Sequence, residues 1–328
     1  MVSFTKGKML KILSELRDSL RQKKFSSSMF PLFVFICGEQ ILDENEQIKP
    51  SNDLRREKNK RQFILDQIQN ISSRMVVGVI AETLIATFKD SDSLTFEGIL
   101  ADISDEIVII VESVGTFCEL GAFSFSQDLI GKLYVLNDES HKEDKSFINR
   151  GPIRKINNAR GAQSKYIVYD TDEWEKDAEL KDHFELWKKR KVAFQVPKID
   201  EETKVYQVNL KCFVYEVINI ISIFQPVTKS EFLEIYKFLR GTFRINDSQN
   251  KVKQVSPIFE MLQKLRLIEK VDQYYFSNVE NCCNNYMFDL TVGETEKIRV
   301  KILDEYLKND PARIEVKKNH DDFGTDVS

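Results

Sequence analysis

One stretch of the chain places several carboxylic acids around a short apolar run. Asp102 and Asp105 precede the β-branched run 107–111, and Glu112 and Glu119 follow it. Such a run predicts a strand buried on both faces, followed by a tight turn and a helix that begins near Thr116. Like charges that converge destabilise one another, so an acidic cluster at a strand end indicates chemistry more readily than packing.

Glu119 is the candidate catalytic residue of this stretch. Cleavage of an N-glycosidic bond develops positive charge at the anomeric carbon, and an ionised carboxylate can stabilise that carbon or capture it covalently. The helix N-terminus would favour the ionised form. Asp102, Asp105 and Glu112 could hold ribose hydroxyls or a nucleobase. The pattern alone does not choose between hydrolysis and transfer.

A purely structural interpretation also fits Glu119. Thr116-x-x-Glu119 has the spacing of a capping box, in which the glutamate only satisfies the backbone of its own helix end. Glu82, after another apolar run, could face a pocket or cap a strand. Cys37 and Cys118 lie beside the expected pocket, but no histidine pairs with either, so a thiol nucleophile is not expected.

Five apolar segments are expected to form the sheet that positions these side chains: 30–37, 75–80, 107–111, 132–136 and 166–169. Helical patterns over 51–71, 94–103 and 117–130 alternate with them, which predicts an α/β domain with a parallel sheet. Sites in such sheets lie at the carboxyl ends of strands, so Gly38, Glu39, Glu112 and Ser113 are expected near the pocket.

The second half of the chain has a different character. Helices are expected over 208–224, 228–243 and 256–267, followed by a hairpin over 268–276, which is the element order of a winged helix. The expected organisation is an amphipathic N-terminal helix over 1–25, an α/β domain over 26–197, a mostly helical winged-helix-like domain over 198–316 and a polar tail over 317–328.

Composition narrows the function classes. The net charge is −4, so any contact with nucleic acid must use local patches. Residues 141–165 form the strongest patch, an expected long loop with seven Lys or Arg against two acids. The same loop could instead hold substrate phosphates. Nucleic-acid or partner contacts are predicted for Lys145, Arg150, Arg154, Lys155, Lys251 and Lys253.

Several classes of site are not expected. Five Cys without a CxxC pair and three scattered His favour neither a disulfide framework nor a metal site, so we expect no metal and no cofactor. The longest apolar runs span about eight residues, far below the ~20 of a membrane helix, and the N-terminus lacks a signal-peptide pattern. A cytoplasmic protein with no membrane contact is therefore expected.

Three segments carry a resemblance to a known family. Residues 104–123 resemble the nucleoside 2-deoxyribosyltransferase signature, and the closer resemblance is to the deoxyribosyltransferase-like effectors of bacterial retron anti-phage systems. Residues 33–39 resemble their first strand and site loop, and residues 145–155 resemble their loop after the core sheet. The likeness extends to the winged-helix-like part and so spans most of the chain.

The resemblance implies a flavodoxin/Rossmann-like fold and a toxic N-glycosidase. Its substrate would be NAD or a related nucleotide, and a reverse transcriptase with its multicopy single-stranded DNA (msDNA), a DNA–RNA hybrid, would hold the enzyme in check. Glu119 would be the nucleophile, and the pocket would be lined by Gly38, Glu39, Asp102, Glu112, Ser113 and Thr116. No counterpart is found of the carboxyl-terminal segment that transferases insert into a neighbouring subunit's site, which favours hydrolysis.

Two alternative functions stay open at this stage. The first is a nucleoside deoxyribosyltransferase of salvage metabolism, against which the basic loop and the appended C-terminal domain argue. The second is a catalytically silent DNA-binding regulator whose α/β domain senses a nucleotide. The sequence leaves the substrate, the activation trigger and any higher-order assembly undecided.

Overall fold

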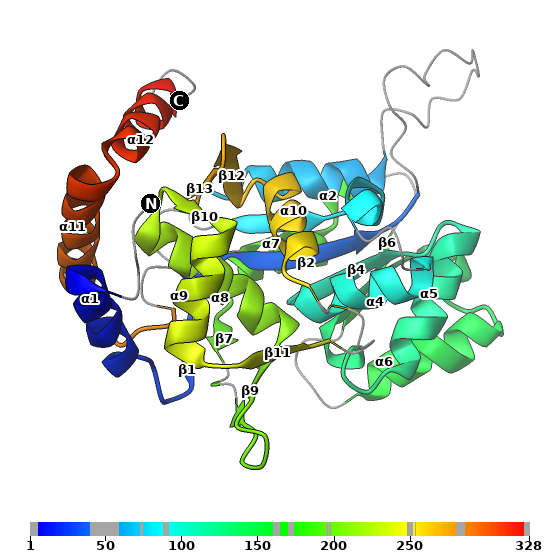
Figure 1. Cartoon of the computed structure of the whole chain (residues 1–328). Coiled ribbons are helices and arrows are strands. Elements are labelled where there is room, and N and C mark those ends of the chain that lie inside the picture. The colour runs from blue at the N-terminus through cyan, green and yellow to red at the C-terminus, as the bar shows by residue number, and fades with distance from the viewer. Residues whose placement is uncertain are drawn as a thin grey trace. The chain divides into compact units, whose positions relative to one another are not determined.

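The computed structural model describes residues 6–39, 59–72, 75–87, 92–159, 165–169, 174–194, 196, 198–247, 252, 254–279 and 286–324. The chain divides into two compact units (Figure 1). The α/β unit contains residues 27–85 and 91–192, and the helical unit contains residues 1–26, 86–90 and 193–328. Within the described residues, no helix combines the length and the apolar content needed to cross a bilayer.

A five-stranded sheet forms the centre of the α/β unit, with strand order β3-β2-β4-β5-β6 and every neighbouring pair parallel. The strands are β2 (Leu32–Cys37), β3 (Val76–Val79), β4 (Glu106–Ile110), β5 (Leu133–Asp138) and β6 (Lys165–Tyr169). The predicted parallel sheet is confirmed. All six residues of β2 and all five of β4 are buried, which explains their continuous apolar runs.

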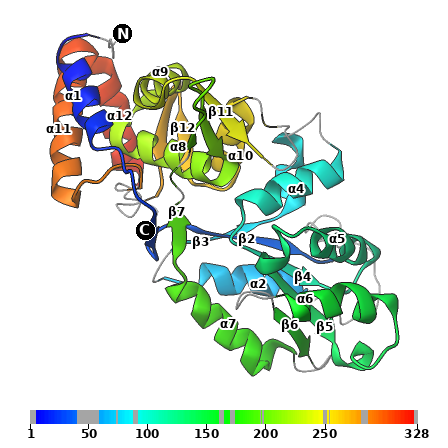
Figure 2. The ribbon, with the colours of Figure 1, turned by 90° about the horizontal axis from the view of Figure 1, so that it is seen from below.

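Helices connect these strands and cover both faces of the sheet (Figure 2). Helices α2 (Lys60–Gln69) and α7 (Ala178–Lys189) share one face, where Phe63 packs 6.4 Å from Phe184, measured between ring centroids. Helices α4 (Ser93–Ile103), α5 (Val114–Phe125) and α6 (Arg154–Asn158) cover the other face. Phe123 of α5 packs there against Phe35 of β2. Short helical turns complete the unit: α3 (Ala81–Leu84), η4 (Ile130–Lys132), η5 (Glu139–His141), η6 (Asn149–Ile153) and η7 (Trp174–Lys176). Turn η3 (Ile85–Thr87) follows α3 and continues into residues assigned to the helical unit.

The order of the strands creates a switch point between β2 and β4. The chain passes from β2 to β3 on one side and then returns to β4 on the other side. The connecting helices therefore diverge at the carboxyl ends of β2 and β4, which is where parallel sheets bind ligands. The amino end of β4 is held by the α7 segment, because Glu106 accepts hydrogen bonds from Trp187 (2.9 Å) and Arg190 (2.5 Å).

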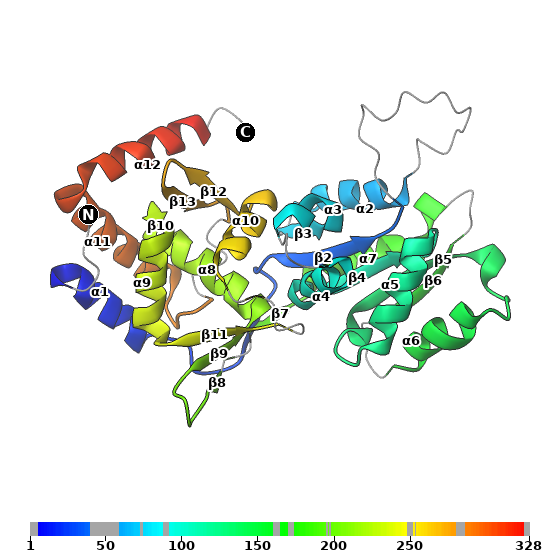
Figure 3. The ribbon, with the colours of Figure 1, turned by 45° about the vertical axis from the view of Figure 1, so that its right-hand side comes forward.

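The helical unit surrounds one almost completely buried helix, α8 (Leu210–Phe224), as Figure 3 shows. Helices α9 (Lys229–Arg240) and α10 (Ser256–Lys264) and the hairpin β12 (Ile268–Val271)–β13 (Tyr274–Ser277) follow, so the predicted three helices and hairpin are confirmed. Strand β10 (Val227–Thr228) adds to β13. A second small sheet joins β11 (Phe243–Asn246), β9 (Tyr206–Asn209) and β8 (Lys198–Ile199). These additional strands were not predicted.

The N-terminal helix is part of the helical unit. Helix α1 (Gly7–Asp18) buries Met9, Ile12, Leu13 and Leu16, and it packs on α9 and α11 (Val292–Asn309). Glu15 of α1 accepts a hydrogen bond from Lys301 of α11 at 2.8 Å. The short strands β1 (Phe25–Ser27) and β7 (Val192–Phe194) pair with each other. The amphipathic pattern of α1 thus arises because one face of the helix is covered by residues almost 300 positions away in the sequence.

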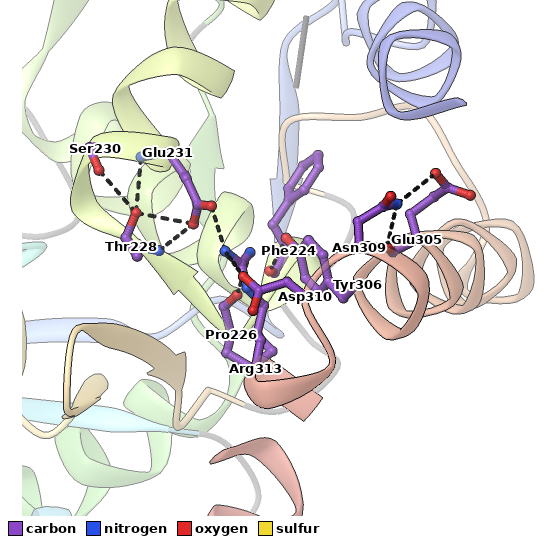
Figure 4. Close-up of polar contacts among 10 residues, drawn as sticks. All are labelled: Phe224, Pro226, Thr228, Ser230, Glu231, Glu305, Tyr306, Asn309, Asp310 and Arg313. Atoms are coloured by element: carbon purple, nitrogen blue, oxygen red, sulfur yellow. Dashed lines mark hydrogen bonds and ion pairs between the residues drawn. The ribbon is translucent and has the colours of Figure 1, made fainter. Parts of the chain in front are cut away.

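Helix α12 (Pro311–Gly324) is held by a buried arginine, although its polar sequence from 317 onwards predicted a tail without regular structure. Figure 4 shows Arg313, which is 2% exposed, donating to Glu231 at 2.5 Å and pairing with Asp310 at 3.3 Å. Its guanidinium also lies 4.3 Å from the ring centroid of Tyr306, whose hydroxyl donates to the Phe224 carbonyl. These contacts order the C-terminal helix.

Replacing Arg313 by Ala should destabilise the helical unit by about 3–5 kcal/mol, because the buried Glu231 carboxylate would lose its charged partner. Urea unfolding would measure the loss, and limited proteolysis should show early cleavage in α12. Lys318→Ala provides the matched control, since Lys318 is an exposed cation of the same helix. If the two variants unfolded at the same urea concentration, the Arg313 pairing would contribute nothing to stability.

Candidate active site

A cavity of about 280 Å³ lies at the carboxyl edge of the sheet, at the switch point. The end of β2 contributes Phe35 to Cys37 and the following Gly38. The segment after β3 contributes Glu82, α4 contributes Glu97, and α5 contributes Glu119. Four chain segments that are distant in sequence therefore place acidic and apolar side chains around one space.

The structural interpretation of Glu119 as a capping residue is wrong. Helix α5 begins at Val114, two residues before the predicted start, and Ser113 is its N-cap. The capping box is formed by Ser113 and Thr116, whose side chain accepts from the Ser113 backbone at 3.0 Å. Glu119 consequently lies in the second turn, where no helix-end N–H group requires it, and its side chain lines the cavity.

The surroundings of the Glu119 carboxylate act on its charge in opposite directions. Burial raises its pKa, and the negative charge of Glu82 adds to this effect. A hydrogen bond from the Cys37 thiol and the positive charge of Arg61 offset the rise only in part, so the pKa of Glu119 stays above its ordinary value. Burial also raises the pKa of Cys37 well above its ordinary value, so this thiol stays protonated and acts as a donor rather than a nucleophile. Glu119 Oε2 is buried and has no hydrogen-bond partner within the described residues.

Glu97 is a second carboxyl group in the same cavity. Burial raises the pKa of Glu97 to about 7, and the neighbouring charges of Glu119 and Glu82 add to this effect. Glu82, Glu97 and Glu119 thus share the cavity, and near neutral pH the Glu97 carboxyl group exchanges protons readily. Glu97 was not predicted as a site residue.

Arg61 supplies the compensating positive charge. It is 3% exposed, and it donates to the carbonyls of Gly38 (3.2 Å) and Glu39 (3.3 Å) and to Glu82 (3.0 Å). Although burial works in the opposite direction, these contacts with Arg61 lower the pKa of Glu82. A side chain at Gly38 would meet Arg61 Cδ at 3.2 Å from an ideal Cβ, so glycine permits the arginine to reach the cavity.

Glu112 organises the loops beside the cavity. Its carboxylate accepts from the Glu39 backbone N–H and from Lys60, both at 3.0 Å. It therefore joins the turns that follow β2 and β4. Among the predicted pocket residues, Gly38 lines the cavity directly, Glu39 and Glu112 adjoin it, and Ser113 and Thr116 cap the site helix.

The prediction that Asp102 lines the pocket requires correction. Asp102 lies in the last turn of α4, which leads into the amino end of β4, and its carbonyl accepts from Lys132. Asp105 likewise accepts from the Phe33 backbone at 3.0 Å near the amino end of β2. Both residues therefore lie at the amino end of β4, whereas Glu119 follows its carboxyl end, and neither of them lines the cavity.

The basic residues after β5 form a helical segment rather than the predicted long loop. Turn η6 and helix α6 follow one another from Asn149 to Asn158, with Pro152 and Ile153 packed inward. Asn149 organises the preceding turn by donating to the carbonyls of His141 (2.6 Å) and Asp144 (2.9 Å). Lys145, Arg150 and Arg154 are exposed on this segment, while Lys251 and Lys253 lie outside the described residues.

The residues missed by the sequence analysis share one property. Arg61 and Glu97 lie inside helical patterns, and nothing in their immediate sequence distinguishes them from solvent-facing charges. Only the packing of α2 and α4 against the end of β2 makes them buried and mutually dependent. Within the described residues, no group of three or more His, Cys, Asp and Glu side chains is placed to hold a metal ion.

The fold and the cavity define an α/β protein with buried carboxyl groups at the switch point of a parallel sheet. The family described as "STM3845 retron effector protein" matches this chain over residues 57–270. That match covers more than half of the 328 residues, so the chain belongs to this family of retron effector proteins.

Two proteins of Escherichia coli are similar to the chain. The protein named "Retron Ec73 putative ribosyltransferase/DNA-binding protein" is 27% identical over 234 residues, which are 69% of this chain and 71% of that protein. The protein of retron Ec86 with the same description is 41% identical over 75 residues, which are 23% of this chain and 24% of that protein. The resemblance to retron effectors is therefore confirmed.

The raised pKa of Glu97 predicts a pH-dependent stability. The neutral carboxyl group suits the cavity, so its contribution to stability is full below about pH 4.5 and is lost as the pH rises through about 7. Glu97→Gln should therefore unfold at a higher temperature than the parent protein at pH 8, with the difference disappearing near pH 4. Thermal unfolding across this range measures it, with Asp182→Asn as an exposed carboxyl control on α7. If the difference in unfolding temperature between Glu97→Gln and the parent protein did not change with pH, the raised pKa of Glu97 would be contradicted.

Proposed function

We propose that the chain is the toxic enzyme of a retron and cleaves the N-glycosidic bond of NAD or a related nucleotide. The observation that carries this proposal is the Glu119 carboxylate, which lines a cavity at the switch point and has an oxygen without a partner within the described residues. The name of the Ec73 relative, which includes ribosyltransferase, supports chemistry at a ribose carbon. The strand order is that of flavodoxin-like folds, as the resemblance to deoxyribosyltransferases implies.

The reaction would proceed in two displacements at the anomeric carbon. A Glu119 oxygen attacks that carbon, and the bond to the base nitrogen breaks with its electron pair passing to the base. With NAD, nicotinamide leaves as a neutral molecule and needs no proton. Water then attacks the glycosyl ester, its second proton passes to a base, and the Glu119 carboxylate is restored.

Glu97 is suited to receive that proton. Its pKa of about 7 makes the carboxylate a base strong enough to deprotonate the attacking water and still available in the ionised form. The Cys37 thiol and Arg61 would favour the charged form of Glu119 that the first displacement requires, against the effect of burial. The cavity would bring these groups together around one sugar, and hydrolysis would be favoured over transfer.

The nucleic-acid side of the function has its own support. Membership of the retron effector family supports association with the retron reverse transcriptase and msDNA. In the helical unit, the elements α8, β10, α9, α10, β12 and β13 come in the order of a winged helix, with β11 added between α9 and α10. The sheet order β10-β13-β12 agrees with that fold. We assign this unit and the basic surface of the α/β unit to partner binding.

Glu119→Gln should abolish base release while leaving the fold intact. The amide keeps the size of the side chain but removes the nucleophile and its charge, so the rate should fall at least about a hundredfold. Incubation of the purified protein with NAD and with nucleosides, followed by identification of the released base, measures it. Asp102→Asn is the control, because Asp102 precedes β4 and should not affect the rate. Unchanged release by Glu119→Gln would refute the proposal, as would loss of release in the control alone.

Glu97→Gln should change how the rate depends on pH. If the Glu97 carboxylate accepts a proton from water, kcat with NAD should rise through about pH 7 in the parent protein, following the pKa of Glu97. The amide variant should be slow and lack this rise. Measurement of nicotinamide release between about pH 5 and 9 tests this. A rate of nicotinamide release that stayed constant or fell through pH 7 would contradict the role of Glu97 as the base.

A further inference from the structure

Two phenylalanine rings are strongly exposed on the surface of the α/β unit. Phe125 ends α5 and Phe147 precedes η6, and each is 82% exposed. Leaving a large apolar side chain in water forgoes the stabilisation that burial would give, so a paired exposure of this kind indicates a binding surface. Helix α5 and turn η6 are in contact, as the ribbon in Figure 3 also shows.

Both rings are held by the basic segment that follows β5. The Lys155 ammonium lies 4.7 Å from the centre of the Phe125 ring and donates to the Phe125 carbonyl at 3.3 Å. The Phe147 ring lies 3.5 Å from the position of a Cβ on Gly151. Lys155 is one turn beyond Gly151, so the two rings flank the same stretch of helix. We call the rings with Lys145, Arg150, Arg154 and Lys155 the aromatic–basic surface.

The charges of this surface are not neutralised by the protein. Lys145, Arg150 and Arg154 are exposed, and the side chain of none of them forms a hydrogen bond or an ion pair within the described residues. The acids of the same turn are Glu143 and Asp144, and Asp144 pairs with His141 at 2.9 Å. The surface therefore presents flat apolar rings between cations that lack anionic partners.

We propose that the aromatic–basic surface binds single-stranded nucleic acid. Cations contact the phosphates of any strand, but only unpaired bases expose the faces that can stack on Phe125 and Phe147. The inference rests on the nucleic-acid partner of the proposed function, and it identifies the unpaired part of that partner as the ligand of this unit. Because stacking accepts every base, binding is tolerant of sequence.

A protein partner suits this surface less well. Val114, which is 79% exposed, extends the apolar face of α5 and would suit a protein contact. The three unpaired cations on the neighbouring segment would then be desolvated without an anion, which is costly. A polyanion satisfies the cations and covers the rings together, so nucleic acid agrees with both observations.

The test uses the full-length protein and a fluorescein-labelled oligothymidylate of about 20 nucleotides, an oligouridylate of the same length and the matching DNA duplex. Fluorescence anisotropy gives each Kd between about 50 and 200 mM salt. Phe125→Leu and Phe147→Leu keep an apolar side chain but remove the ring. Leu186→Ala, which removes another exposed apolar side chain of the same unit, is the matched control. Base release by each variant is measured in parallel.

We expect each leucine variant to bind the single strands roughly tenfold more weakly, with the duplex and base release unaffected. Arg150→Glu with Arg154→Glu should weaken both strands and duplex and reduce the salt dependence. Equal binding of strand and duplex, or strands bound normally by both leucine variants, would overturn the proposal. A change of oligomeric state in the leucine variants without a change in strand binding would assign the surface to protein contact instead. Normal strand binding by a Glu119→Gln protein, together with absence of base release in the parent protein, would refute the glycosidase and leave this inference standing.

Discussion

The candidate site of the α/β unit depends on how negative charge is distributed where water is scarce. Glu119, Glu97 and Glu82 converge on one cavity, and three ionised carboxylates there would repel one another strongly. One buried cation, Arg61, pairs with Glu82. The pKa of Glu97 is about 7, so this side chain can be neutral near physiological pH. The Cys37 thiol donates a hydrogen bond that favours the charged form of Glu119. Two features place Arg61 among these acids: Gly38 has no side chain to crowd it, and α2 carries it to the end of β2.

The helical unit also buries a carboxylate, but there all of its oxygens are satisfied by neighbouring donors. Glu216, fully buried in α8, accepts hydrogen bonds from Tyr206 at 3.0 Å and from Tyr236 and pairs with Arg240 at 2.5 Å. No oxygen of this carboxylate is left for a ligand, because each one already has a donor. The contrast separates the two kinds of buried acid: a satisfied network fixes the fold, whereas the unpartnered Glu119 oxygen is available for chemistry.

The sequence predicts those parts of the fold and the site that depend on interactions between residues close together in the chain. The buried strands and the position of Glu119 after β4 follow from local apolar runs and turn residues, and they were predicted. Arg61 and Glu97 could not be predicted, because their roles arise only when α2 and α4 pack at the sheet edge. Asp102 was misplaced because acids from both ends of β4 were grouped with the resemblance as one cluster, whereas only residues after the strand reach its carboxyl end. Gly151 and Pro152 indicated a loop, yet tertiary packing accommodates them in a helical segment.

Helix α5 carries both the catalytic candidate and one ring of the aromatic–basic surface. Phe125 follows Glu119 by six residues, which at 3.6 residues per turn places it about 9 Å further along the axis and about two-thirds of a turn around it. Glu119 therefore faces the cavity while Phe125 faces solvent. A nucleic-acid strand on the outer surface would contact helix α5 without entering the cavity that Glu119 lines. If both proposals hold, mutation should separate nucleic-acid binding from substrate cleavage although the two sites share one helix.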